Sequence, residues 1–268
     1  MEKITSLKTP LKGATDHYFI VSDWHSYHMH KPSYSVMIQH AKMFPKKDRK
    51  LIINGDFLDV EHLMKGQESF KKFASRADGI EDFFLPESEA EFNWGNERLD
   101  ELQKIFSEII FISGNHDWRY DWFKESKHCP SAYAANFDLR VQLALGPRGI
   151  KFVQYNDWLD IGNFAVTHGA FHGTTSHKKH YEACGKSCIF GHIHKNEVKS
   201  FAVRGETKTV WSLPAMCDLN PAYMKNLPNN WDNGYATCHM RYNGSFNMHT
   251  HVIIKGETVF PDGTIIKA

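Results

Sequence analysis

Seven side chains of the types that bind divalent cations stand directly after short hydrophobic runs along this chain. They comprise two aspartates, one asparagine and four histidines, namely Asp23, His25, Asp56, Asn115, His168, His192 and His194. Carboxylate and amide oxygens are hard donors and imidazole nitrogens are borderline donors, so the set suits two divalent cations held close together. Such a pair activates water and clamps a phosphate. The expected chemistry is therefore hydrolysis of a phosphoester.

The spacing of these residues supports a shared site. Asp23 and His25 are two residues apart, as are the last two histidines, and in an extended chain this spacing directs both side chains to one side. Either pair alone has little specificity. Their joint occurrence with residues 55–56 and 114–117 is hard to explain by packing, because buried, unpaired aspartates and histidines cost several kcal/mol. Coordination of a metal offsets that cost.

The hydrophobic runs that precede the motifs predict strands at the centre of a sheet. Continuous apolar runs bounded by glycine are typical of strands covered on both faces. An α/β sheet places its ligands at the carboxyl ends of such strands. The predicted strands are 18–21, 51–53, 109–112, 151–153, 158–161, 164–166, 187–190, 198–203, 207–211, 234–237 and 251–254, with a turn at Asn243-Gly244.

Helices are expected between these strands. Pro32 can open a helix, and Leu99, Leu102, Ile105 and Phe106 predict an amphipathic helix late in the segment 61–107. We expect an α/β protein with two sheets packed face to face and helices outside. Length and apolar content favour one domain over residues 1–268, with a helical insertion at about 61–107. The tail 256–268 is either a final hairpin or an arm exchanged between subunits, and the oligomeric state stays open.

Composition excludes several classes of protein. Lys and Arg total 32 against 31 Asp and Glu, and a net charge of +1 gives no overall field to recruit nucleic acid or membranes. A local basic groove is still possible. The five cysteines are too few and too scattered for a disulfide framework, so we expect reduced, packed thiols. No segment approaches the roughly 20 apolar residues of a membrane span, and no secretory leader is evident. We expect a cytoplasmic protein without a membrane partner.

The ordered motifs resemble those of the calcineurin-like metallophosphoesterase superfamily. Asp-x-His, Gly-Asp-x-x-Asp, Gly-Asn-His-Asp, His-Gly and Gly-His-x-His follow one another across roughly residues 18–195. The resemblance implies a four-layer α/β/β/α sandwich with two mixed sheets and a dinuclear centre of Mn²⁺ first, or of Fe or Zn²⁺. It also implies one cation on Asp23, His25 and His194, another on Asn115, His168 and His192, and Asp56 as the bridge. From Thr167 through residues 218–223 to residues 231–235, the chain is also similar to a subgroup found in bacterial and bacteriophage genomes.

The resemblance assigns catalytic roles to two further residues. His116 would be an acid that binds no metal and protonates the leaving oxygen, and Asp59 would orient it. From the residues alone, Asp59 is equally well a carboxylate at a helix N-terminus. Asp117 is expected to support the site structurally. Val60-Glu61 stands where phosphoprotein phosphatases have arginine-glycine, which argues against a protein-phosphatase activity.

Three residues near the motifs are candidates for binding substrate. Arg119 would clamp a phosphate, because guanidinium matches phosphate geometry; the alternative is a surface ion pair with Asp121 or Glu125. His28 and His30 would contact the substrate phosphate, or else lie in a solvated loop.

The substrate predicted first is a nucleotide or nucleic acid, cleaved by a hydrolase of phosphodiesterase or nuclease type. Five aromatic residues beside the motifs could stack on bases: Trp24, Tyr27, Trp118, Tyr120 and Trp122. The alternative is a phosphomonoesterase for small phosphorylated metabolites. Eight acidic residues between Glu81 and Glu101 favour it if they shape a closed pocket, whereas a solvated face is the simpler explanation. A third possibility, a non-catalytic scaffold, fits less well because no core motif position is missing.

Overall fold

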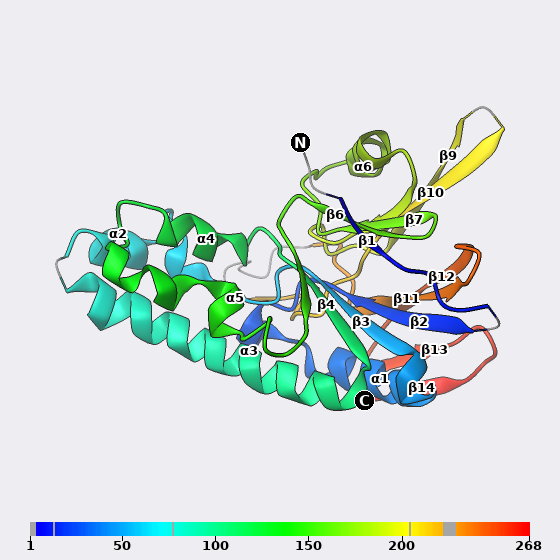
Figure 1. Ribbon diagram of the computed structural model, residues 1–268, viewed down its shortest axis with the longest axis horizontal. Helices are drawn as coiled ribbons and strands as arrows, with labels where there is room; N and C mark the ends of the chain where they lie inside the picture. Colours follow the sequence, from blue (N-terminus) through cyan, green and yellow to red (C-terminus); the bar gives the residue numbers. More distant parts are fainter. Residues whose placement is uncertain (1–3, 13, 77, 204, 222–228) are drawn as a thin grey trace.

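The computed structural model describes residues 4–12, 14–76, 78–203, 205–221 and 229–268, and its two mixed six-stranded sheets carry helices on their outer faces (Figure 1). One sheet has the order β12-β11-β2-β3-β4-β5 and the other β1-β6-β7-β8-β10-β9. The predicted four-layer α/β/β/α sandwich is confirmed. Residues 222 and 223, which belong to the stretch similar to the bacteriophage-type subgroup, lie outside the described residues.

The first sheet contains three consecutive parallel pairings, β2 with β3, β3 with β4 and β4 with β5, while β11 pairs antiparallel with β2 and β12. Its strands are β2 (Thr15–Val21), β3 (Arg49–Asn54), β4 (Glu108–Ile112), β5 (Lys151–Val153), β11 (Gly234–Arg241) and β12 (Phe246–Val252). In the second sheet, β7, β8 and β10 run parallel to one another. Its strands are β1 (Ile4–Leu7), β6 (Trp158–Ile161), β7 (Phe164–Thr167), β8 (Ser187–Phe190), β9 (Glu197–Val203) and β10 (Glu206–Ser212).

The apolar runs are continuous because the first sheet is buried on both faces. Along β2, Ile20 faces the second sheet in a core that it shares with Ile189 of β8. Its neighbours Phe19 and Val21 face the opposite way, into the core beneath the helices. Both faces therefore require apolar residues, and no polar alternation is left in the sequence.

The helices cover the outer faces of the sandwich. Against the first sheet lie α1 (Lys31–Lys42) and α3 (Leu85–Ile105), and α6 (Ser176–Cys184) covers the second. With α3, the helices α2 (Glu68–Ala74), α4 (Trp118–Lys124) and α5 (Leu139–Gln142) form a lobe at one end of the molecule (Figure 1). Short helical turns are η1 (Ser26–His28), η2 (Lys46–Asp48), η3 (Glu61–Leu63), η4 (Ile80–Phe84) and η5 (Ser131–Phe137). Within the described residues, no helix is both long and apolar enough to cross a bilayer.

Two expectations for the C-terminal part are refined. The strand predicted at 251–254 ends earlier, as β12, and forms a hairpin with β11 around Gly244, whose φ of +78° suits glycine. The tail forms a hairpin of β13 (Glu257–Val259) and β14 (Ile265–Lys267). It folds back on α1, where Gln39 Nε2 donates to the Lys267 carbonyl at 2.7 Å.

Candidate metal centre

The predicted ligands follow the carboxyl ends of five strands, and main-chain hydrogen bonds hold their loops together. After β2 and β3, Asp23 N donates to the Gly55 carbonyl at 3.0 Å and His25 N to the Asp56 carbonyl at 3.0 Å. After β7 and β8, Gly191 N donates to the His168 carbonyl at 2.8 Å. Main-chain hydrogen bonds thereby fix residues that are far apart in the sequence against one another.

Glycines allow these loops to approach closely. A Cβ on Gly114 would lie 2.1 Å from Asp56 Oδ1 and 2.2 Å from Asp56 N. A Cβ on Gly55, where φ is +82°, would lie 2.2 Å from His168 Nδ1. No side chain fits in either position, which is why each motif begins with glycine.

Backbone strain is concentrated at the same place. Five of the seven predicted ligands have a left-handed backbone: Asp23 (φ 57°), His25 (φ 51°), Asp56 (φ 49°), His192 (φ 67°) and His194 (φ 57°). Each such residue costs on the order of 1–2 kcal/mol and persists only when its surroundings impose it. The turns aim side chains into one space, which regular strand geometry would not do.

One group of donors surrounds Asn115. Its Oδ1 lies 3.0 Å from His168 Nε2 and 2.9 Å from His192 Nδ1. His168 Nε2 is also 3.3 Å from Asp56 Oδ2. Because His168 Nδ1 donates to the Asn54 carbonyl at 2.8 Å, Nε2 of the neutral ring carries a lone pair. That lone pair therefore faces two oxygen acceptors, an arrangement that only a cation or an added proton makes favourable.

The second group surrounds His25 and His194. His25 Nδ1 donates to Asp59 Oδ1 at 2.8 Å, so its buried Nε2 is left as a lone pair with no hydrogen-bond partner among the described residues. His194 Nε2 lies 3.2 Å from Asp23 Oδ1, and its buried Nδ1 also has no partner in the part of the chain that the structure describes. Asp56 Oδ2 is 4.0 Å from His25 Nε2, so this carboxylate adjoins both groups.

The electrostatics of the site require positive charge. Burial opposes ionisation of His168, but the Asp56 carboxylate outweighs burial and raises the pKa of His168 to about 10. Burial also opposes charge on Asp23, yet His194 lowers the pKa of Asp23 to about 2. A proton on His168 stands where a cation would bind. Oxygen and nitrogen donors with orphaned lone pairs fit two divalent metals, and the residues present match the predicted ligand set.

The structure places His116 beside this cluster. His116 Nδ1 donates to the Asp59 main-chain oxygen at 2.6 Å, which leaves Nε2 4.0 Å from Asp56 Oδ2. Burial lowers the pKa of His116, but Asp56 and Asp59 outweigh burial and raise it above the ordinary value.

The Asp59 carboxylate contacts two imidazoles. Its Oδ1 is 2.8 Å from His25 Nδ1 and 3.4 Å from His116 Nδ1. Burial opposes its ionisation, but the hydrogen bonds with the two histidines hold the pKa of Asp59 well below its usual range. Asp59 thus orients His25 through its carboxylate and His116 chiefly through its carbonyl. The helix-terminus alternative finds no support, because η3 has Val60 as its N-cap and no side-chain cap.

The three substrate-binding candidates differ in position. Arg119 Nη1 donates to the Asp59 carbonyl at 2.9 Å, and its Nη2 lies 3.2 Å from His116 Nε2, so the guanidinium packs along that imidazole. His28 Nε2 is 3.9 Å from Asp59 Oδ2 at the edge of the site. His30 is not brought into the cluster, because its Nδ1 accepts from Ser33 N at 3.4 Å and caps α1.

Two buried carboxylates brace the loops from behind. Asp117, expected to be structural, accepts from the main-chain N of Gly114 and of Leu58, both at 2.9 Å. Glu91 of α3 was not singled out by the sequence, and it accepts from Val60 N at 3.0 Å and from Asp59 N at 3.1 Å. Burial raises the pKa of Glu91 to about 7, against these hydrogen bonds.

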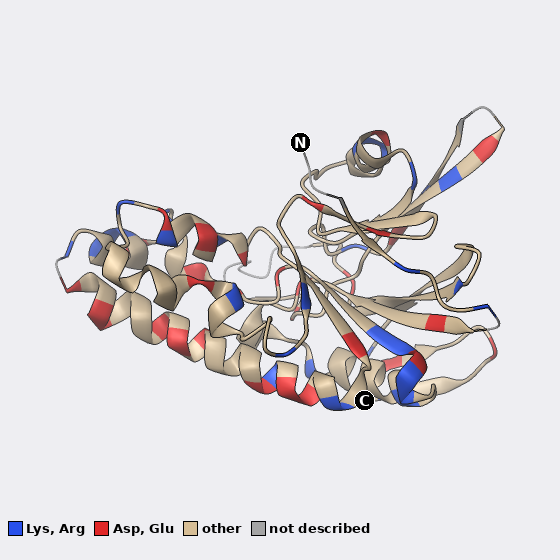
Figure 2. Ribbon diagram, viewed as in Figure 1, with Lys and Arg blue, Asp and Glu red and all other residues tan. Residues whose placement is uncertain are grey.

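The acidic segment therefore has two roles. Seven of its eight carboxylates are exposed, and the five of them on α3 give that helix the acidic outer surface visible in Figure 2. Glu91 alone is buried, with 5% of its surface exposed. No pattern in the sequence separates it from its neighbours except its position among the buried residues of α3, such as Phe92 and Leu99.

Two cavities adjoin Asp59. One of about 270 Å³ is lined by His116 and Arg119 together with Glu61, Met64 and Gln67. The other, of about 350 Å³, reaches under the helical lobe and is lined by Tyr27, His28, Glu61, Glu87 and Glu91 among others. Of the aromatic residues expected to stack on bases, Trp24 and Tyr120 are fully buried and cannot do so. Tyr27 and Trp118 are 61% and 41% exposed.

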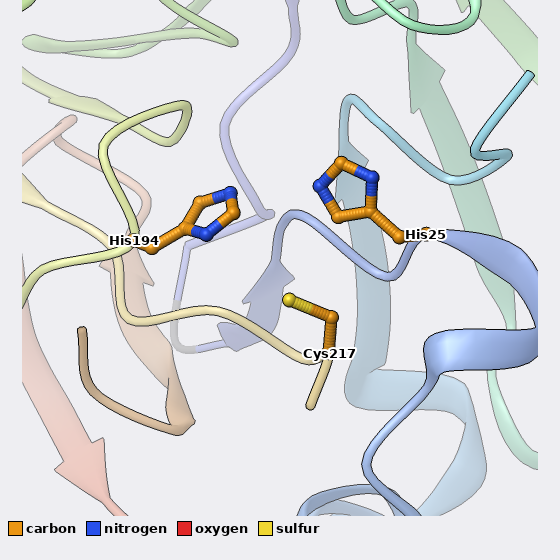
Figure 3. Close-up of side chains that lie close together, drawn as sticks. All are labelled: His25, His194 and Cys217. Carbon is orange, nitrogen blue, oxygen red and sulfur yellow. The ribbon is translucent and has the colours of Figure 1, made fainter. Parts of the chain in front are cut away.

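A cysteine completes one side of the site. The ligand atoms of His25, His194 and Cys217 all lie within 4.8 Å of one another (Figure 3). All five cysteines are free thiols, as expected, but Cys217 was predicted only as a packed one. Its position after β10, which runs parallel to β8, is the signal that could have identified it.

No family model and no curated protein matches the sequence of this chain. Among solved structures, Vps29 from Chaetomium thermophilum is similar with 6% identity and a TM-score of 0.39, over 94% of this chain and 96% of that one. The hypothetical protein PH1004 from Pyrococcus horikoshii OT3 has 10% identity and a TM-score of 0.41, over 87% of each chain. Similarities this loose give no information on activity, and the similarity to a bacteriophage-type subgroup stays a prediction.

Proposed function

We propose that this protein is a metal-dependent hydrolase of phosphoesters with a dinuclear centre. The proposed ligands are Asp23, His25 and His194 for one cation and Asn115, His168 and His192 for the other, with Asp56 between them. The observation that carries the proposal is the buried convergence of lone pairs. Asn115 Oδ1 and Asp56 Oδ2 lie 3.0 Å and 3.3 Å from His168 Nε2, so three atoms that can each offer a lone pair to a cation converge at one buried point. Manganese is the expected metal, with iron or zinc as alternatives.

The cations would supply Lewis acidity, making water acidic near neutral pH and offsetting the charge on the phosphoryl oxygens. The chain itself positions the proton that the leaving oxygen needs. His116 holds its Nδ1 proton on the Asp59 carbonyl, so Nε2 points toward the cluster and the adjoining cavity. The Asp56 and Asp59 carboxylates raise the pKa of His116, a direction that suits a general acid. Arg119 lies along the same ring, where its guanidinium can bind a phosphoryl oxygen.

The test compares wild type with His116→Asn, using an aryl phosphodiester and the matching monoester in the presence of Mn²⁺. We expect the variant to keep its metals and to lose about 10²–10⁴-fold in turnover, because a general acid contributes about that much. His128→Asn, a half-buried histidine between α4 and η5, is the matched control. Full turnover by His116→Asn would remove the proposed acid. Bound metals with no turnover of any phosphoester would instead favour the non-catalytic scaffold.

The nucleotide or nucleic acid predicted from the sequence is the first candidate substrate, and one observation favours the second. The larger cavity beside Asp59 is lined by Glu61, Glu87 and Glu91, and carboxylates repel an extended polyanion. A small phosphorylated metabolite would avoid that repulsion. Cleavage of single-stranded DNA that requires His116 would support the first candidate. Preference for the monoester over the diester, with DNA left intact, would support the second.

A further inference from the structure

Cys217 occupies a position equivalent to those of the predicted ligands. Strand β10 runs parallel to β8, with Ser212 opposite Phe190, so both strands end at the same edge of the second sheet. His194 comes four residues after the end of β8, and Cys217 comes five residues after the end of β10. The thiol is thus delivered to the site by the same architecture that delivers the histidines.

The backbone around Cys217 is fixed against the loop that carries His25. Met216 N donates to the Ser22 carbonyl at 3.0 Å, and His30 N donates to the Met216 carbonyl at 2.7 Å. On the other side, Asn233 Nδ2 donates to the Cys217 carbonyl at 2.6 Å. Hydrogen bonds at Met216 and at the Cys217 carbonyl therefore fix the backbone that carries the thiol.

Two buried imidazoles lie beside the thiol. The exposed fraction is 3% for Cys217 and 6% for each of His25 and His194. Both His25 Nε2 and His194 Nδ1 are buried and form no hydrogen bond with any residue that the structure describes. Figure 3 shows the Cys217 side chain pointing toward the space between the two imidazole rings. A cysteine that only filled space would lie among apolar side chains, whereas this one lies beside two imidazoles.

The distances are compatible with one shared cation. The three donor atoms lie within 4.8 Å of one another. Around zinc, nitrogen and sulfur ligands stand at about 2.0–2.3 Å, which puts two ligands of a tetrahedral ion roughly 3.5 Å apart. A small contraction of the three side chains would bring them to a common metal. On binding, the thiol proton would be released to solvent, leaving a sulfur–metal bond.

We propose that Cys217 is a further ligand of the cation held by Asp23, His25 and His194, and that this position selects zinc or iron over manganese. The proposal rests on the proposed dinuclear centre. Thiolate is a soft ligand that favours zinc and iron, whereas the position around Asn115 offers only nitrogen and oxygen, which also suit manganese. The two cations of the centre are therefore expected to differ.

The test is zinc-edge X-ray absorption on the full-length chain loaded with zinc. We expect a sulfur scatterer at about 2.3 Å in wild type. It should disappear in Cys217→Ser and persist in Cys238→Ser, the control for a buried thiol in the core between the sheets. We also expect Cys217→Ser to bind the tighter of its two zinc ions at least about tenfold more weakly than wild type does, measured in competition with excess manganese. A loss of this size is common when a residue of a metal site is replaced.

The spectrum of wild type decides the question even if Cys217→Ser fails to fold. Two zinc ions per chain surrounded by nitrogen and oxygen alone would overturn the role of Cys217 and leave the proposed function standing. A chain that takes up no divalent metal would overturn both. A sulfur signal that survives in Cys217→Ser would assign the ligand to another cysteine and refute this proposal.

Discussion

Glu91 should stabilise the site from behind, and replacing it tests how the loops are held. Its carboxylate accepts from Val60 N at 3.0 Å, from Asp59 N at 3.1 Å, from Ser26 Oγ at 3.0 Å and from Tyr120 Oη at 3.2 Å. These partners belong to the loop after β2, the loop after β3 and helix α4. One carboxylate of a long helix thus connects three segments of the metal centre.

The cost of Glu91→Ala follows from what is left unpaired. Asp59 N keeps Ser26 Oγ at 3.0 Å as an acceptor, and the two hydroxyls can rotate toward other groups. Val60 N has no replacement among the described residues. One orphaned amide costs about 1–3 kcal/mol, and the lost charged hydrogen bonds add a similar amount. We therefore expect Glu91→Ala to lower the free energy of unfolding by about 3–4 kcal/mol.

Glu91→Gln separates hydrogen bonding from charge. The amide oxygen can still accept from Val60 N and Ser26 Oγ, while the amide nitrogen can donate to the Tyr120 hydroxyl. We expect a loss of about 1 kcal/mol, the value of a single neutral hydrogen bond. Because burial raises the pKa of Glu91 from 4.5 to about 7, wild type loses stability as the pH rises between these two values, whereas Glu91→Gln does not. The gap between Glu91→Gln and wild type should therefore narrow as the pH rises from 5 to 8.

The assay is urea unfolding of the metal-free protein, followed by manganese titration. Glu89→Ala, on the exposed side of the same helix, is the control and should change stability by less than about 0.5 kcal/mol. We expect Glu91→Ala to weaken metal binding as well, because the loop carrying Asp59 loses its anchor. Stability and metal affinity within error of the Glu89→Ala values would refute the idea that Glu91 holds the loops.

Three further outcomes are expected. Gly114→Ala should abolish metal binding and destabilise the chain by at least about 1–3 kcal/mol, because the added methyl would overlap Asp56. Gly146→Ala, where the added methyl meets open space, should have neither effect. Wild-type metal content in Gly114→Ala would contradict this prediction. Burial lowers the pKa of His40 to about 4, so the full stability is present above pH 6.5 and the free energy of unfolding falls by about 2 kcal/mol at pH 5. In His40→Asn, the loss of stability to urea on acidification should be smaller by that amount. An unchanged pH profile in this variant would contradict the prediction. Chelation of bound metals should lower Tm by about 5–10 °C, because a ligand at a hundredfold its Kd stabilises the folded chain by about 2.7 kcal/mol. A Tm that does not change when chelator is added would count against a structural contribution of the metals.

The sequence predicted the parts of the site that depend on local pattern. A strand buried on both faces needs a continuous apolar run, so the run before Asp23 marks both the strand and its carboxyl end. Parallel strands bring such ends to one edge, which is why the ligand residues could be grouped without a structure. The same logic fixes the glycines of the motifs, since Gly55 and Gly114 stand where loops nearly touch.

Residues that act across long separations were not predictable in this way. Glu91 reaches Val60 from 31 positions away, and in the sequence it is one carboxylate in an acidic helix. Trp24 stands beside a ligand and looked available for stacking, yet it is fully buried against Tyr34 and Phe57. Whether an aromatic side chain or a carboxylate points inward depends on which element covers it, and periodicity within one segment does not contain that information.

The bracing carboxylates explain how strained turns can exist around so many ligands. Left-handed residues at Asp23, His25 and Asp56 each raise the energy of the folded chain. Asp117 and Glu91 oppose that tendency by accepting main-chain N–H groups that the turns expose, and neither carboxylate is proposed as a metal ligand. The loops are therefore braced by carboxylates of the protein itself. The metal-free chain should therefore keep its metal-binding side chains in place. Metal binding then requires little reorganisation, because the strained turns already form when the chain folds.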